Sequence, residues 1–453
     1  MEELAVKNVS NVNWLALVFL AVMSLVVLRS NRQKAVIAVL LTALLVPLGQ
    51  QFVILGLHFR FYRLLIFVGM CRLMSRGEGR GFRLTGMDKL LIAWTLVTVV
   101  CGVIRGPKAE TFGNAYDVLG TYFLFRVWME DAEDSIAHLR VLAVAVLLVA
   151  VCMSQELVTH RNLFSVFGGV PDTTFERDGR FRCQGPFRHP ILAGTFAATL
   201  FPLMVGLWFQ DRSDRKRALV GLIACGFCTY ATASSGPLMT FMAAIIGFGL
   251  WPMRYRMRLI RRGLLATLIG LALVMNAPIW YLIARLSDLT GGTGWHRSYL
   301  IDQAVKHFNE WWLVGSSYTA HWAEDQYTVL AVDPDNMDIT NHYIAQGLQG
   351  GLLGLGLFIA IIVCGFKNVG SVVTGRNGIF HEPKVWWLFG VSLCSHCVAF
   401  ISVSYFDQIQ VFWFWLLAVL ATLQVTANKR LAANRLLQSA EDPDREHLVA
   451  ASG

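Results

Sequence analysis

The sequence predicts an all-α, polytopic integral membrane protein with about 12–14 transmembrane helices and one large external loop that contains short helices. The first observation behind this prediction is composition. Hydrophobic residues make up 55% of the 453 residues and charged residues only 15%, whereas soluble globular chains carry roughly 25% charged residues. The second observation is that the apolar residues gather into long runs, many of them close to the length of about 20 residues that a membrane-spanning helix needs.

Thirteen apolar runs are candidate spans. Two of them are weak, because 60–74 is short and 115–130 contains Asp117 and Arg126. We expect these two to be tilted, re-entrant or interfacial if they do not span. The candidates are 12–28, 35–57, 60–74, 88–104, 115–130, 137–154, 190–210, 218–233, 236–252, 263–284, 343–366, 385–403 and 409–427.

The positive charges of the short connections predict the orientation. Cytoplasmic loops carry an excess of Lys and Arg, and alternating the thirteen spans places five basic connections on one side. The N-terminus is then external, the C-terminus is cytoplasmic, and loops 155–189 and 285–342 are external. The five basic connections are 29–34, 75–83, 211–217, 254–262 and 428–435.

Several familiar sequence patterns are absent from the chain. The first apolar run has no small-residue cleavage site, so we expect it to remain as an anchor. There is no phosphate-binding loop and no dinucleotide fingerprint, and the nine cysteines lie mostly inside apolar runs, which does not indicate a zinc site. We therefore expect no cofactor and no nucleic-acid partner, and an active site that takes its substrates from the membrane and the external side.

The first external loop is rich in arginine on the side of the membrane where positive charge is normally depleted. Arginine presents a planar fork that holds phosphate oxygens in pairs, so the cluster indicates an anion site. The alternative is a loop that binds lipid headgroups or pairs with Glu176 and Asp178. The four arginines are Arg177, Arg180, Arg182 and Arg188.

The second external loop contains an amphipathic helix that begins near Ser298, because apolar residues recur there at helical spacing. His296 and Arg297 precede it, and an arginine at a helix N-terminus makes an anion site. The alternative is a surface helix whose Arg and His face water. The acidic segment Asp333–Asp338 lacks the glycine and the distal glutamate of a calcium loop, so no metal is expected.

His342 stands where the second external loop enters the next apolar helix. A histidine at a membrane–water boundary can act as a base at neutral pH, and the neighbouring Arg297 favours that role. A structural hydrogen bond is the alternative. The glycines from Gly347 to Gly356 would let another helix approach closely, or serve packing alone.

Three short motifs together resemble the O-antigen ligase and polysaccharide polymerase superfamily of bacterial envelope proteins. The first has the form R-x-x-G-x-F-x-[NH]-P, the second G-x-x-R followed by an amphipathic helix, and the third N-x-Y-[LI] before a G-x-x-G helix. The resemblance covers about residues 150 to 365. Its residues are Arg182, Gly185, Phe187, His189 and Pro190; Arg297 through Leu313 and Gly315; and Asn341, Tyr343, Ile344, Gly351 and Gly354.

The resemblance implies a metal-independent glycosyltransferase of the bacterial inner membrane. Its donor would be an undecaprenyl-diphosphate-linked oligosaccharide at the outer face of that membrane, and its acceptor a glycan or a lipid. Arg182 and Arg297 would grip the diphosphate, and His342 would deprotonate the acceptor hydroxyl. Further substrate contacts are expected from Arg180, Arg188, His189, His296, Asn341 and Tyr343. Membrane lipids, a flippase and a chain-length regulator are the expected partners.

One departure from the family pattern bears on the choice of acceptor. The ligase pattern places His directly before Asn, but Thr340 occupies that position here and His342 follows Asn341. We therefore expect a polymerase of O-antigen or exopolysaccharide repeats, with transfer to the lipid A core as the alternative. A polytopic transporter or flippase of lipid-linked glycans is the alternative from another class, but it should carry mid-membrane charges and an internal repeat.

This prediction divides the chain into four parts. Residues 1–154 form N-terminal transmembrane helices, and 155–366 form a ligase-like core with both external loops. Residues 367–427 form C-terminal transmembrane helices, and 428–453 form a cytoplasmic tail.

Overall fold

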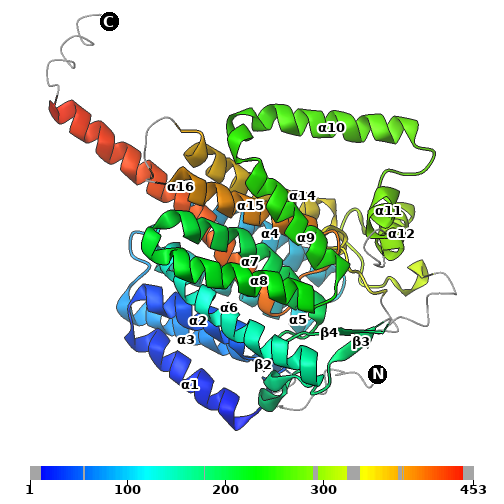
Figure 1. The fold of residues 1–453 in the computed structure, drawn as a ribbon, viewed down its shortest axis with the longest axis horizontal. Helices are drawn as coiled ribbons and strands as arrows, with labels where there is room; N and C mark the ends of the chain where they lie inside the picture. The colour runs from blue at the N-terminus through cyan, green and yellow to red at the C-terminus, as the bar shows by residue number, and fades with distance from the viewer. Residues whose placement is uncertain are drawn as a thin grey trace, which may run out of the picture.

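A computed structural model describes residues 12–54, 57–177, 179–288, 294–323, 337–375, 380 and 382–441. Helices dominate these residues, as the composition predicts, and pack into a bundle (Figure 1). Two short antiparallel hairpins interrupt the helical pattern, so the chain is not purely α. One joins β1 (Gln51–Ile54) to β2 (Leu57–Arg60), and the other joins β3 (Phe175–Arg177) to β4 (Arg180–Arg182).

The N-terminal half of the bundle contains six helices between residues 14 and 159. They are α1 (Trp14–Arg29), α2 (Arg32–Leu45), α3 (Phe61–Arg76), α4 (Gly86–Ile104), α5 (Ala109–Trp128) and α6 (Asp134–Thr159).

The C-terminal half contains helices of very different length, and its longest run past the predicted part boundaries at 366 and 427. They are α7 (Pro190–Gln210), α8 (Arg215–Ala231), α9 (Ser235–Gly249), α10 (Met257–Val274), α11 (Tyr281–Asp288), α12 (Gly294–Lys306), α13 (Phe308–Trp311), α14 (His342–Val373), α15 (Pro383–Ala399) and α16 (Gln408–Glu441). Short 3₁₀ turns are η1 (Leu163–Phe167), η2 (Arg212–Asp214), η3 (Trp251–Arg256) and η4 (Ala320–Trp322).

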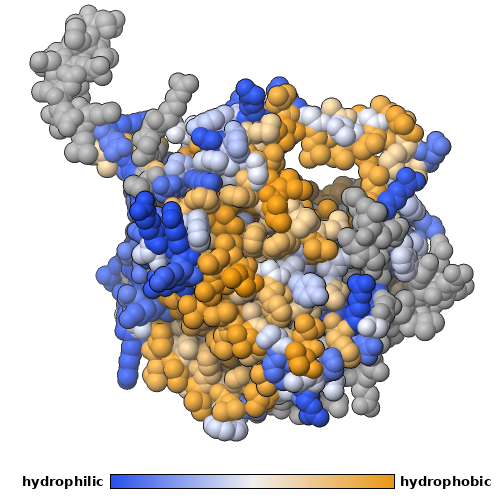
Figure 2. Space-filling model, in the orientation of Figure 1, coloured by the Kyte–Doolittle hydropathy of each residue, from blue (hydrophilic) through white to orange (hydrophobic). Residues whose placement is uncertain are grey.

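Five of the described helices are long and apolar enough to cross a membrane, namely α4, α6, α7, α14 and α16. The helices α1 and α9 are apolar but shorter. Apolar side chains cover much of the face shown in Figure 2, which suits a surface in contact with lipid. Exposed examples on α6, α8 and α9 are Val144, Leu148, Val151, Leu219, Ile223, Ile245 and Ile246. The protein is thus a largely helical, membrane-associated chain, and the larger number of spans stays a prediction.

Two candidate spans differ from the helices that form. The run 35–57 contributes α2 only as far as Leu45, because Pro47 and Gly49 follow and the chain then enters the β1–β2 hairpin. The run 263–284 is wrong as a single span. Its helix α10 ends at Val274, α11 begins only after Pro278, and none of the residues of α10 is buried (Figure 1).

The two weak candidates, 60–74 and 115–130, do form helices, α3 and α5, and their charges are paired. Asp117 accepts hydrogen bonds from Tyr62 at 2.5 Å and from Arg63 Nε at 2.7 Å. Arg126 lies 3.4 Å from the Asp88 carboxylate. Pairing lowers the cost of burying these charges, which is why their presence in the sequence did not prevent helix formation.

A break within α14 fixes the segment from Trp311 to Gly315 against the bundle. Gly350 and Gly351 have non-helical backbone angles, with φ of +64° at Gly351. A side chain at Gly351 would collide with the carbonyl oxygen of Leu313, and the N–H of Leu352 donates to the carbonyl of Trp312 at 2.8 Å. The glycines therefore admit the external segment, whereas the sequence suggested the approach of another helix.

Candidate functional site

The two arginines that the sequence singles out meet at the turn between α8 and α9. Arg182, on β4, donates from Nε to the carbonyl oxygen of Thr232 at 3.2 Å and from Nη2 to the hydroxyl of Ser234 at 2.5 Å. Arg297, on α12, donates from Nη2 to the hydroxyl of Ser235 at 3.4 Å. Residues more than 100 positions apart in sequence are thus held on two consecutive serines.

The serines stand at the N-terminus of α9, where backbone N–H groups lack partners within the helix. No side chain caps this terminus, and its first turn contains no acidic residue. The positive end of the helix dipole therefore points toward the same region as the two guanidinium groups. Gly236 permits the close packing, because a Cβ atom there would lie 3.4 Å from Arg297 Nη2 and 2.6 Å from the Ser402 hydroxyl.

The Arg297 guanidinium is deeply buried and has no counter-ion among the described residues. The residue is only 5% exposed, and its Nη1 has no hydrogen-bond partner among the residues that the structure describes. Burial, with a smaller contribution from the charge of Arg177, lowers the pKa of Arg297 to about 10. The side chain is still charged at neutral pH. A buried cation of this kind is costly unless an anion pairs with it.

His189 and Arg177, from the loop 155–189, lie close enough to this pair to interact with it electrostatically. Burial, followed by the positive charges of Arg182 and Arg177, lowers the pKa of His189 to about 4. The ring accepts the N–H of Ile191 at Nδ1, at 3.2 Å, and so caps α7. The proton therefore sits on Nε2, and His189 is a neutral hydrogen-bond donor at physiological pH.

We call Arg177, Arg182 and Arg297, with Ser234 and Ser235, the arginine cluster. It combines three guanidinium groups, two hydroxyl groups and a helix N-terminus, all of them suited to bind an anion. Such an arrangement can hold a phosphate group and stabilise the negative charge that develops on a leaving phosphate.

The other predicted substrate contacts are mostly engaged elsewhere. Arg188 lies 3.8 Å from the carboxylate of Asp407, which also pairs with Arg60 at 2.8 Å. Arg180 is exposed at the start of β4. His296 lies beside Asp338, but burial outweighs the attraction of that carboxylate and lowers the pKa of the imidazole.

The residues at the start of α14 have structural partners. The Asn341 side chain accepts the N–H groups of Tyr343 at 3.0 Å and Ile344 at 3.2 Å, and so caps the helix. The Tyr343 hydroxyl donates to the carbonyl of Cys397 at 3.0 Å. Both were predicted as substrate contacts. These bonds give them a place in the fold, and their contact with substrate stays a prediction.

His342 is buried among aromatic rings, and both of its ring nitrogens have neighbours. Nδ1 accepts the N–H of Tyr405 at 3.1 Å, and Nε2 lies 3.2 Å from the Gln346 amide. The ring stacks on Phe400 with centroids 4.7 Å apart. The proton then sits on Nε2, and a rotation of the Gln346 amide gives it an oxygen acceptor. This geometry favours the structural alternative, and the base role of His342 stays a prediction that the geometry does not support.

A cavity of about 300 Å³ lies between the end of α4 and the start of α14. Ile339 lines it, and the preceding residue, Asp338, interacts with His296. Its polar lining includes Arg105, Lys108, Ser316, Ser317, Thr319 and Gln349. A hydrophilic group such as a sugar fits this lining.

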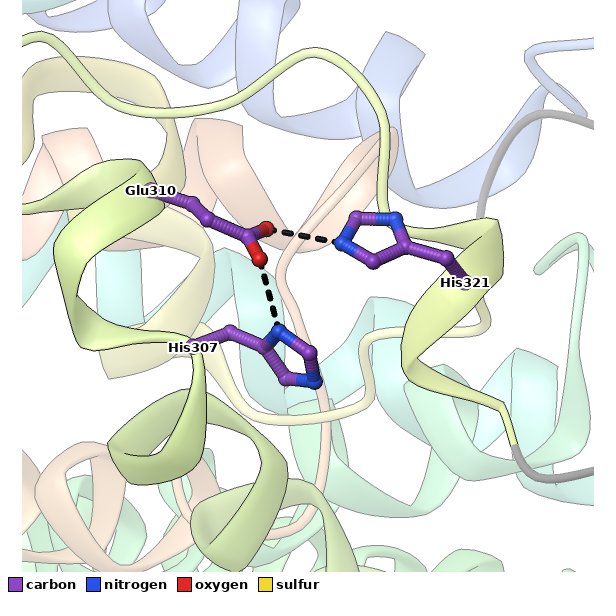
Figure 3. A group of neighbouring side chains, drawn as sticks. All are labelled: His307, Glu310 and His321. Carbon is purple, nitrogen blue, oxygen red and sulfur yellow. Dashed lines mark hydrogen bonds and ion pairs between the residues drawn. The ribbon is translucent and has the colours of Figure 1, made fainter.

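One group of side chains in the described part of the chain has the composition of a metal site. His307, Glu310 and His321 offer ligand atoms within 4.8 Å of one another (Figure 3). They belong to the second external loop and not to the arginine cluster. The acidic segment that the sequence raised as a metal candidate lies outside the described residues as far as Asn336.

Sequence reasoning missed the serine turn that organises the arginine cluster. In the sequence, residues Thr232 to Gly236 form a short polar gap between two apolar runs. Pro237 is the signal that a helix begins there, because proline is favoured in the first turn of a helix, and α9 does begin at Ser235. No model of a known protein family matches the chain, and no curated protein is significantly similar to it.

Proposed function

We propose that the protein is a membrane glycosyltransferase that polymerises undecaprenyl-diphosphate-linked glycan repeats at the outer face of the bacterial inner membrane. The observation that carries the proposal is the buried Arg297 guanidinium, which meets Arg182 at the N-terminus of α9 without a counter-ion in the described chain. A diphosphate supplies the missing negative charge.

The chemistry follows from this placement. The acceptor hydroxyl attacks the anomeric carbon of the donor sugar, the bond from that carbon to the diphosphate oxygen breaks, and the hydroxyl proton passes to the departing diphosphate or to water. Arg182 and Arg297 stabilise the leaving diphosphate, and preorganised donors of this kind contribute most where charge develops. The neutral His189 donates a further hydrogen bond. The cavity between α4 and α14 would hold the acceptor.

The first test is the surface-glycan profile of a deletion strain complemented with wild type, Arg297→Ala or Arg182→Ala. We expect either variant to reduce long polymer by at least about 100-fold, as loss of one transition-state donor does, while single repeats persist on the lipid carrier. Arg161→Ala is the matched control, because this exposed arginine lies in the same loop as Arg182 and pairs with exposed Asp172.

Two other outcomes would change the assignment. Long polymer that remains on undecaprenyl diphosphate and is absent from lipid A would indicate a ligase, since the donor chemistry is the same and the acceptor differs. Unchanged surface glycans in the deletion strain would reject glycan transfer and favour the transporter alternative.

A further inference from the structure

We propose that His307, Glu310 and His321 form a site for a divalent transition-metal ion, with zinc as the expected metal. The site lies in the second external loop and joins α13 to η4. It is independent of the proposed glycosyl transfer, because no residue of the arginine cluster contributes to it.

The three side chains already converge on a common centre. Glu310 lies between the two imidazole rings, with Oε1 2.7 Å from His307 Nδ1 and Oε2 2.8 Å from His321 Nε2 (Figure 3). His307 and Glu310 come from adjacent turns of one segment, and His321 reaches in from η4. Two ligands that are three residues apart, together with a third from farther along the chain, would close the loop between α13 and η4 when they bind one metal ion.

The donor set suits zinc. Two imidazoles and one carboxylate, with a fourth position left to water, are a known zinc ligand set. Bonds of about 2.0–2.1 Å in tetrahedral geometry separate ligand atoms by roughly 3.3 Å, while these atoms lie within 4.8 Å of one another. Small side-chain rotations are therefore enough. Exposed fractions of 38% for Glu310 and 40% for His321 leave room for the water ligand.

Neighbouring groups hold the ligands in position. The indole N–H of Trp322 donates to Glu310 Oε2 at 3.0 Å. The ring of His307 stacks on Trp322 with an angle of 12° between their planes, and His321 stacks on Tyr318 at 10°. Hydrogen bonds and packing that orient metal ligands in this way raise the affinity of a site.

Metal binding requires only that the ring protons of the two histidines move to other nitrogens. Each imidazole points a ring N–H at the carboxylate in the metal-free arrangement. When the metal binds, these protons move to the outer ring nitrogens, and the inner nitrogens become ligands. Two neutral imidazoles and one carboxylate then leave a single net positive charge on the bound dication.

The site would stabilise the small apolar core that carries α12. Trp322 and Trp311 are buried in this core together with Leu300 and Ala304 of α12. Arg297 lies on the same helix, one turn before Leu300. Joining α13 to η4 therefore restrains the element that holds Arg297.

Metal binding is tested on the purified full chain in detergent, prepared without a histidine tag and titrated with Zn²⁺ against a competing chromophoric chelator. We expect wild type to bind zinc stoichiometrically, and Glu310→Gln and His321→Asn to lose the binding. Trp322→Phe keeps the stacking but removes the indole donor, so its affinity should fall roughly 10- to 100-fold. Zn²⁺ should raise the Tm of wild type and leave the Tm of Glu310→Gln and His321→Asn unchanged.

The matched control is His160→Asn. His160 lies in the first external loop with φ of +59°, a conformation that asparagine tolerates, so this variant should bind zinc as wild type does. The proposal is overturned if wild type binds no zinc, or if Glu310→Gln binds it equally well, since the group is then a plain ion pair. The ligand variants Glu310→Gln and His321→Asn change exposed side chains. Their Tm without metal reports whether they are folded.

Discussion

Arg297 shows how a single residue can mark a site. A guanidinium that is 5% exposed and has no counter-ion in the described part of the chain does not stabilise the fold by itself. This guanidinium lies at the N-terminus of α9, where the helix dipole adds further positive charge. Such an arrangement is costly in the absence of a ligand and favourable with an anion bound, which is the physical basis of the proposed diphosphate site.

Residue types alone predicted part of this site. Arg182 and Arg297 stand out in the sequence because they are cations in external loops, and the structure brings them together. Ser234 and Ser235 do not stand out, since serine is common in any turn. The surroundings of His342 are equally invisible, because its stacking partner Phe400 and hydrogen-bond partner Tyr405 come from a segment about 60 residues away.

His189 provides a pH test at the residue scale. Its pKa is lowered from 6.5 to about 4 in the folded protein, so the unfolded chain takes up a proton first as the pH falls. The stabilisation is complete above pH 6.5 and is lost between pH 6.5 and about 4. We expect His189→Asn, which can still cap α7, to reduce the fall in Tm over this range.

Thermal unfolding in detergent from pH 7 to pH 4 measures this effect. His160→Asn is again the control, because its ring is exposed. An identical pH dependence of Tm in wild type and His189→Asn would contradict the assignment of His189 as a buried, neutral donor.

At the scale of the element, α14 and α9 set the geometry of the candidate site. The break at Gly350 and Gly351 lets the chain from Trp311 to Gly315 lie against α14. Ser234 and Ser235, at the N-terminus of α9, accept hydrogen bonds from Arg182 and Arg297 and so hold the arginine cluster together. The sequence showed the glycines but not their purpose, because the residues that they admit are about 40 positions earlier in the chain.

Gly351→Ala tests the role of the break. A Cβ atom would meet the Leu313 carbonyl, and φ of +64° is strained for alanine, which costs about 1–3 kcal/mol. We expect a lower Tm and faster proteolysis near Leu313. Gly356→Ala is the control, since nothing lies within 4 Å of its Cβ position; equal behaviour of the two variants would contradict the proposed packing.

At the scale of the whole molecule, the sequence predicted what depends on local composition. Every candidate span contains helical residues, and five described helices are long and apolar enough to cross a membrane. The sequence did not predict where the chain changes direction, as at Pro47 and Pro278. It also did not predict long-range ion pairs such as Arg60–Asp407, which decide which charged side chains remain free to bind a ligand.

The central claim is that the α9 terminus and the arginine cluster bind a prenyl diphosphate, and the most direct measurement is binding of farnesyl diphosphate to the purified protein in detergent. We expect binding to wild type and to Arg161→Ala, and affinity roughly 10- to 100-fold weaker for Arg297→Ala, as loss of a hydrogen bond to a charged group predicts. Farnesol should bind weakly to all three. Equal affinity of wild type and Arg297→Ala for the diphosphate would contradict the account.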